Sequence, residues 1–229
     1  MTRTLLYLVK PGDDNEELRY SLRTLVNLPH ERVVFVGHRP AWVRGVDWIP
    51  GNRHPSKWPN VYDNLRLAAE RLDRLVVMNN DFYVMRPTVE VPAWYRGRLV
   101  DHLDGCKRGA WRRSLETTLR LLRNLGHDDP LSYETHTPVE MEGPKLTEAL
   151  LIGRRETNLP QWRTMYGNLY RVPARQFVDC KLRKSTTPVA DDPAFLSTSD
   201  ATWLSHPWCE TIRSRFPDPS PYEAAPSTP

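Results

Sequence analysis

The fold is decided by the stretch Arg74-Leu75-Val76-Val77-Met78-Asn79-Asn80-Asp81-Phe82-Tyr83-Val84-Met85. Its Val-rich apolar run is typical of a buried strand, and the run ends abruptly in Asn79, Asn80 and Asp81. In open parallel sheets, ligands bind outside the carboxyl ends of the strands. A carboxylate at that edge can bind a metal, accept a proton or hold a ribose hydroxyl. A plain strand-terminal turn is the competing interpretation, because Asn and Asp are common turn residues.

The residues before this stretch follow an alternating strand and helix pattern. Apolar runs predict strands over 4–9, 32–37 and 46–49, and leucines at helical spacing predict a helix from about Glu16 to Asn27. A second helix is predicted over 60–72, with Asn60 as its cap. Strand, helix, strand, strand, helix, strand is an α/β pattern, so we expect a parallel sheet flanked by helices.

The second half is less regular. Helices are predicted over 111–125, 145–152 and 206–215, an extended segment over 132–138, a strand over 177–182 and a loop over 191–200. We expect one α/β domain over 1–216, in which the second half completes the site. A separate C-terminal domain is the alternative. Residues 217–229 are rich in Pro and Ser and are expected to be a disordered tail.

Composition excludes several classes of protein. The 229 residues are 39% hydrophobic and 26% charged, and 32 basic against 28 acidic residues give a formal charge of +4, which is no nucleic-acid tail. Cys106, Cys180 and Cys209 lie far apart, which argues against a disulfide framework or a zinc site and favours a cytoplasmic location. The apolar stretch 5–9 is too short for a signal sequence or a membrane span, and no other segment approaches that length.

Common nucleotide and hydrolase signatures are absent from the sequence: there is no P-loop, GxGxxG, HExxH or GxSxG motif. What remains is a scattered set of polar residues at loop positions, in which a carboxylate or His could deprotonate a hydroxyl while Arg or Lys offsets pyrophosphate charge. This set comprises Asp81, His136, Arg163, Asn168, Lys181 and Asp200, with Arg19 and Arg23 upstream. Taken singly, each has a more ordinary interpretation as a turn residue or a solvated side chain.

Four blocks of the sequence resemble the Stealth proteins, which are capsular polysaccharide phosphotransferases and the related lysosomal-enzyme N-acetylglucosamine-phosphotransferase. Residues 15–25 (NEELRYSLRTL) resemble the family's NELRYSLRSL stretch, and 33–42 (VVFVGHRPAW) resemble its strand and following loop. Residues 79–83 (NNDFY) resemble its NDDFF block, and His136-Thr137-Pro138 its His-x-Pro element. Residues 4–222 as a whole are also similar to compact glycosyltransferases of actinobacterial phages.

The resemblance implies a GT-A-like, Rossmann-like fold and transfer of a sugar 1-phosphate from a donor such as UDP-N-acetylglucosamine. Asp81 then becomes the leading catalytic carboxylate and His136 its partner, with Arg163 following the His block. Donor-binding roles fall to Arg19, Arg23, Asn79, Asn80, Asn168, Lys181 and Asp200. The resemblance also implies Mg²⁺ or Mn²⁺ on the donor, with Asp81 as its protein ligand. Asn80 departs from the family's Asp, and an amide oxygen is a weaker ligand for these cations than a carboxylate.

Several alternatives stay open from the sequence. Attack on the β-phosphorus of the donor would release UMP, whereas attack on the anomeric carbon would release UDP. The acceptor could be a glycan, a phage structural protein or modified DNA, recognised by loops 51–59 and 96–113, and a phage-encoded enzyme would act in the host cytoplasm. A nucleic-acid-binding protein that uses the basic segment 107–113 is the competing class.

Overall fold

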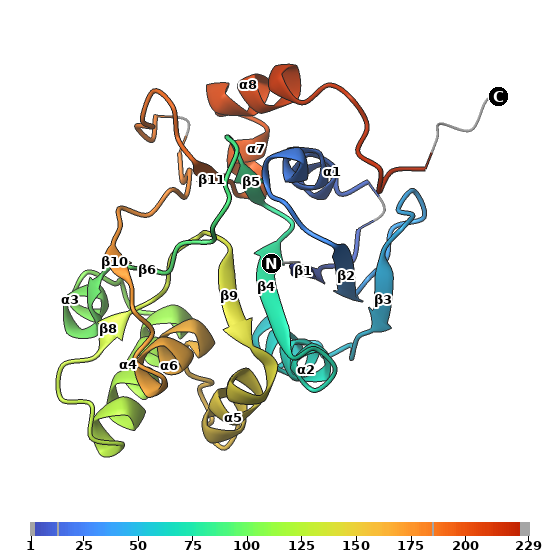
Figure 1. Ribbon diagram of the computed structural model, residues 1–229. Helices are drawn as coiled ribbons and strands as arrows, with labels where there is room; N and C mark the ends of the chain where they lie inside the picture. The colour runs from blue at the N-terminus through green and yellow to red at the C-terminus, as the bar shows by residue number, and fades with distance from the viewer. Residues whose placement is uncertain (1–2, 13, 185, 225–229) are drawn as a thin grey trace.

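The computed structural model describes residues 3–12, 14–184 and 186–224, and its centre is a five-stranded sheet in the order β3-β2-β1-β4-β9 (Figure 1). The sheet strands are β1 (Thr4–Val9), β2 (Arg32–Gly37), β3 (Asp47–Pro50), β4 (Arg74–Asn79) and β9 (Val139–Glu142). The first four run parallel, and β9 is antiparallel to β4. This Rossmann-like order, with helices on both faces, confirms the predicted α/β class.

Alternate residues of each strand point to opposite faces of the sheet, and each face has its own core. Leu6, Val34 and Val77 pack in one core with residues of α2, α4, α5 and α6. Leu5, Val33 and Val76 pack in the other with residues of α1. Figure 1 shows α1 on one side of the sheet and α2 and α5 on the opposite side. The helices are α1 (Glu16–Arg23), η1 (Thr24–Asn27), α2 (Lys57–Ala69), α3 (Leu99–Asp104), α4 (Ala110–Asn124), α5 (Gly143–Gly153), α6 (Trp162–Leu169), α7 (Asp200–Trp203) and α8 (Pro207–Arg215).

Short strand pairs connect the second half to this centre. They are β5 (Phe82–Val84) with β11 (Phe195–Ser197), β6 (Trp94–Tyr95) with β10 (Arg175–Gln176), and β7 (Gly97–Arg98) with β8 (Leu131–Ser132). The strand predicted over 177–182 is not formed. Lys181 makes only an isolated bridge to Ser197, which is enough to bring it beside the end of β4. The single domain over 1–216 stays a prediction.

The antiparallel direction of β9 has a direct effect on the position of the site. Val139, the first residue of β9, pairs with Val77 near the end of β4. The loop that precedes β9 and the loop that follows β4 therefore lie at the same edge of the sheet. His136 belongs to the first loop and Asp81 to the second.

The predicted disordered tail is corrected over 217–224. Glu223 is only 2% exposed and pairs with Val43 in an isolated antiparallel bridge. Its carboxylate accepts hydrogen bonds from Arg19 and Arg23 of α1. These charge pairs compensate for the missing apolar run, which is why composition alone misjudged the segment. The expectation for residues 225–229 lies outside the described residues.

No helix among the described residues is long and apolar enough to cross a membrane.

The predicted helix cap at Asn60 is also corrected. Helix α2 begins at Lys57, after Ser56, and Asn60 lies in its first turn. Pro59 is tolerated there because the first N–H groups of a helix have no intrahelical partner.

Candidate active site

A cleft of about 810 Å³ opens at the carboxyl ends of β1 and β4. The sheet order changes direction between these two strands, since β2 and β3 follow β1 on one side and β4 lies on the other. In open α/β sheets, ligands bind at such a switch point. Val9 and Lys10 from the end of β1 and residues 79–82 from the end of β4 line the cleft. The sheet edge that the Asn79-Asn80-Asp81 sequence predicts as a ligand site therefore lines a cleft.

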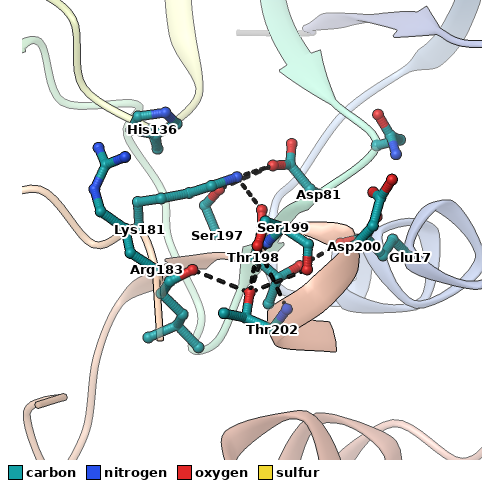
Figure 2. Close-up of polar contacts among 12 residues, drawn as sticks. Glu17, Asp81, His136, Lys181, Arg183, Ser197, Thr198, Ser199, Asp200 and Thr202 are labelled. Carbon is teal, nitrogen blue, oxygen red and sulfur yellow. Dashed lines mark hydrogen bonds and ion pairs between the residues drawn. The ribbon is translucent and has the colours of Figure 1, made fainter. Parts of the chain in front are cut away.

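Asp81 is held by Lys181 at the floor of this cleft. Lys181 Nζ donates to Asp81 Oδ2 at 2.5 Å and also to the carbonyl oxygen of Thr198. Ser197 Oγ donates to the same Asp81 oxygen at 3.2 Å. Figure 2 shows the Lys181 side chain reaching across to Asp81. The carboxylate is fixed by these charge-assisted hydrogen bonds and is aimed at the cavity.

His136 faces the same cleft and is oriented by Asp179. Its Nδ1 lies 2.9 and 3.0 Å from the two oxygens of Asp179, and its backbone N–H donates to Asp179 at 3.0 Å. Burial opposes ionisation of Asp179, but the hydrogen bonds and charge of His136 and the charge of Arg96 outweigh it and hold the pKa of Asp179 below its usual range. An anionic Asp179 accepts the Nδ1 proton, which leaves Nε2 as the basic nitrogen of the ring.

Arg163 lies beneath the cleft and is 5% exposed. Its Nη1 donates to the carbonyl oxygen of Thr137 at 2.8 Å, while Nη2 is buried with no hydrogen-bond partner among the described residues. Burial lowers the pKa of Arg163 to about 10, partly offset by the charges of Glu134, Asp81 and Asp179. Arg163 therefore stays cationic at neutral pH. The guanidinium also packs over the rings of Trp162 and Phe82, with Cζ at 4.8 and 5.5 Å from their centroids, so Arg163 contributes a fixed positive charge beneath the cleft.

A second group of charges lies beside Asp81. Lys10 Nζ donates to Asp200 at 2.6 Å and lies 3.9 Å from Glu17, and Thr198 Oγ1 donates to Glu17 at 2.7 Å. Burial raises the pKa of Glu17 to about 7, opposed by the Thr198 hydrogen bond and reinforced by Asp200 and Asp81. Figure 2 shows Glu17 and Asp200 close together beyond Asp81. Glu17 thus titrates near neutrality inside the cleft.

Aromatic side chains line another part of the cleft. Trp58 and Trp111 both line it, and their ring centroids are 5.7 Å apart. His54 and Pro55 bring the predicted loop 51–59 to the same wall. Flat aromatic surfaces of this kind can hold a nucleobase or a sugar ring.

The structure separates the predicted site residues into two sets. Seven line the cleft, and three do not. The seven are Asn79, Asn80, Asp81, His136, Arg163, Lys181 and Asp200, and the three are Arg19, Arg23 and Asn168.

The donor-binding roles expected of those three residues stay predictions, and their contacts in the structure lie outside the cleft. Arg19 and Arg23 are bound to the buried carboxylate of Glu223, at 2.7 and 2.8 Å, so their charge is already compensated. Asn168 uses its whole amide to hold the backbone: its oxygen accepts from the Leu131 N–H, and its NH₂ donates to the Leu131 and Thr164 carbonyls. These are structural contacts rather than ligand contacts.

A metal ion held by the protein alone does not fit the residues of the cleft. No group of three or more His, Cys, Asp or Glu side chains within residues 3–12, 14–184 and 186–224 is placed to hold a metal ion. Asp81, the expected ligand, already carries the ammonium of Lys181. Asn79 and Asn80 contribute only neutral amides.

Sequence reasoning missed Asp179, Glu17, Glu134 and Lys10 as cleft or supporting residues. Asp179 stands in no motif, and its partner His136 lies 43 positions earlier. Glu17 lies in the block 15–25, in which only Arg19 and Arg23 are predicted to bind the donor, although Glu17 is the buried charged residue of α1. Glu134 is buried and accepts two hydrogen bonds from Thr164. Only its closeness to His136 in the sequence could have indicated it.

No protein-family model matches the chain, and no curated protein matches it. The Stealth and phage resemblances therefore stay predictions. Solved structures do show similarity to this chain. The 2-C-methyl-D-erythritol 4-phosphate cytidylyltransferase of Thermus thermophilus is 13% identical, with 92% of this chain and 100% of that chain covered and a TM-score of 0.43.

Two further solved structures are similar. The apo form of the glycosyltransferase GlyE of Streptococcus pneumoniae TIGR4 is 10% identical, with 96% of this chain and 65% of that chain covered and a TM-score of 0.47. The bifunctional IspDF of Campylobacter jejuni is 9% identical, with 78% of this chain and 50% of that chain covered and a TM-score of 0.35. Resemblances this distant carry no information on substrate.

Proposed function

We propose that this protein is a transferase that uses a nucleotide-sugar donor. The observation that carries the proposal is that Asp81 and His136 line one cleft at the switch point of the sheet. Each is held in place by a charged partner, Asp81 by Lys181 and His136 by Asp179. Nucleotides bind at this place in sheets of this topology. The cleft volume of about 810 Å³ is in the range of small-molecule sites.

The electrostatics of the cleft support an anionic donor. Arg163 and Lys181 are cations with little exposure to water, and the buried Nη2 of Arg163 lacks a partner among the described residues. Cations that are fixed in a site with little water stabilise the negative charge of a pyrophosphate more strongly than solvent-exposed cations do. Trp58 and Trp111 supply flat surface for the base or the sugar.

The Asp179–His136 pair supplies the proton transfer that an acceptor hydroxyl needs. With Nδ1 engaged by Asp179, His136 Nε2 is the atom that takes the proton as the hydroxyl attacks the donor. Asp81 stands across the site to position the acceptor or to stabilise positive charge that develops on the sugar. The same groups serve attack on the β-phosphorus and attack on the anomeric carbon, so the products distinguish the two reactions.

A product assay tests this proposal. The purified protein is incubated with a panel of UDP- and GDP-sugars and a glycan acceptor, and nucleoside mono- and diphosphates are resolved by chromatography. Release of UMP means transfer of a sugar 1-phosphate, and release of UDP means transfer of the sugar alone. D81N and H136A should each lose turnover by at least 10²-fold while remaining folded. D101N is the matched control, because Asp101 is 57% exposed in α3 and pairs with Arg98 outside the cleft. Full activity in both cleft variants would overturn the assignment.

A further inference from the structure

The Asp81–Lys181 pair lies in the cleft at the end of β4, where the sequence resemblance implied a divalent cation on Asp81. Lys181 Nζ contacts a carboxylate oxygen of Asp81 and the carbonyl oxygen of Thr198 (Figure 2). Carboxylate and carbonyl oxygens are the ligands that hard cations take in proteins. The ammonium group therefore already occupies an oxygen-lined cation position at the floor of the cleft.

Lys181 is fixed in this position rather than free to swing away. Its backbone bridges to Ser197, and the flanking residues reinforce that bridge: Leu182 N–H donates to the Ser197 carbonyl at 2.7 Å, and Ser197 N–H donates to the Cys180 carbonyl at 3.3 Å. The side chain is only 13% exposed. An ammonium has three N–H donors, and the two contacts to Asp81 and Thr198 leave the third for a ligand in the cleft.

The remaining carboxylates of the cleft are poorly placed to take over a metal. Glu134 is buried and accepts two hydrogen bonds from Thr164. Asp200 is paired with Lys10 at 2.6 Å. Glu17 accepts from Thr198 and is buried against Asp200. Asn79 and Asn80 bring no charge to the end of β4. A divalent cation on Asp81 would thus meet one carboxylate that is already paired, with the ammonium of Lys181 beside it, and like charges repel strongly at low exposure to water.

We propose that the ammonium of Lys181 replaces the divalent cation of this site, so that the protein binds the diphosphate of its donor without a metal. The third N–H of Lys181 contacts a phosphate oxygen, and Arg163 provides the second cation. The identity of the donor rests on the proposed function. The assignment of Lys181 does not, because it concerns which cation Asp81 holds.

Metal binding is measured first, by the loss of the free Mn²⁺ electron paramagnetic resonance signal on titration with protein. The wild type should leave Mn²⁺ free at this site. K181E places a second carboxylate beside Asp81, so it should bind Mn²⁺ at least tenfold more tightly. The gained site should disappear in the double variant K181E/D81N. K145E is the matched control, because Lys145 forms a comparable ion pair with Glu142 at the exposed start of α5. Wild-type binding that D81N removes would overturn the proposal, and so would equal Mn²⁺ affinity in wild type and K181E.

Nucleotide binding is measured second, by calorimetry with UDP in EDTA. The wild type should bind UDP without metal, K181M should weaken binding at least tenfold, and K181R should retain most of it. Thermal unfolding of each variant confirms that it is folded. UDP binding by the wild type only after Mn²⁺ is added would overturn the assignment. If UDP binds under neither condition, the proposed donor fails, while the Mn²⁺ titration still decides which cation Asp81 holds.

Discussion

Replacing Glu223 by Gln tests whether residues 217–224 belong to the folded protein. The Glu223 carboxylate accepts from Arg19 Nη1 at 2.7 Å and from Arg23 Nε and Nη2 at 2.8 and 2.9 Å. The Ser220 backbone N–H donates to it at 2.9 Å. E223Q keeps the size of the side chain but removes the charge, so two arginines lose their shared partner.

The cost of E223Q follows from the burial of these groups. Removing one partner of a buried ion pair costs about 3–5 kcal/mol. The arginines keep some contact with water, with side-chain exposures of 28% for Arg19 and 11% for Arg23, and can regain part of their hydration. We therefore expect a loss of about 2–3 kcal/mol in the free energy of unfolding, measured by urea denaturation with linear extrapolation. E210Q, at a 78% exposed partner of Arg213, should change it by less than about 0.5 kcal/mol.

The pH dependence of this difference gives a second check. Burial alone would raise the pKa of Glu223, but the hydrogen bonds from Arg23, Ser220 and Arg19 outweigh it and set the pKa at about 2. A carboxyl whose pKa is lowered by folding stabilises the protein above its unfolded pKa and loses that contribution as pH falls through the folded value. The gap between wild type and E223Q should therefore be full at pH 6 and shrink between pH 4.5 and 2. A gap below about 0.5 kcal/mol at pH 6 would refute the packed tail.

Three other predictions follow from single sites. Burial raises the pKa of Glu17 to about 7, so the contribution of this group to the free energy of unfolding is full below pH 4.5 and is lost as pH rises toward 7. In urea unfolding, E17Q should therefore gain stability relative to wild type by up to about 3 kcal/mol between pH 5 and 8. G143A should lose about 1–3 kcal/mol, because a Cβ there would overlap the carbonyl oxygen of Leu72, whereas G105A, with 3.6 Å to its nearest neighbour, should be near neutral in thermal unfolding. D179N should lower kcat on the order of 10²-fold and shift the pH–rate profile while leaving donor KM near wild type, because it removes the carboxylate that orients the cleft histidine; an unchanged profile would argue against that role.

The first half of the fold was readable because its elements carry their own patterns. In β4, the Val-rich run forms a continuous buried segment, as expected of a central strand. In α1, the leucines recur at helical spacing and are buried. Two elements of the second half carry a weak pattern or none. Strand β9 (VEME) alternates apolar and charged residues, but over four residues only, and its position is determined by pairing with β4. Helix α6 is buried on nearly all sides, so its Thr, Gly and Asn residues conceal the helical period.

The candidate site was predictable where a residue lies at a strand end and not where it depends on a distant partner. Asp81 could be inferred from the abrupt end of β4, and the structure places it in the cleft. The pairing of Asp179 with His136 could not, because no local pattern connects residues so far apart in the chain. The pairing of Arg19 and Arg23 with Glu223 could not be inferred for the same reason. Their partner Glu223 lies about 200 positions away, in a segment whose composition suggested no structure.

The antiparallel pairing of β4 with β9 also determines when the site can form. Asp81 and His136 reach the same edge only after Val77 has met Val139, a contact between distant parts of the chain. The parallel strands β1 and β2 are closer in sequence and can pair without it. Contacts that close long loops form slowly, because the chain loses entropy before the contact is made. On refolding from urea, the recovery of enzymatic turnover should therefore lag behind the recovery of sheet structure. A polypeptide that stops before β9 would contain both Asp81 and His136 but would lack the strand pairing that brings them to one edge.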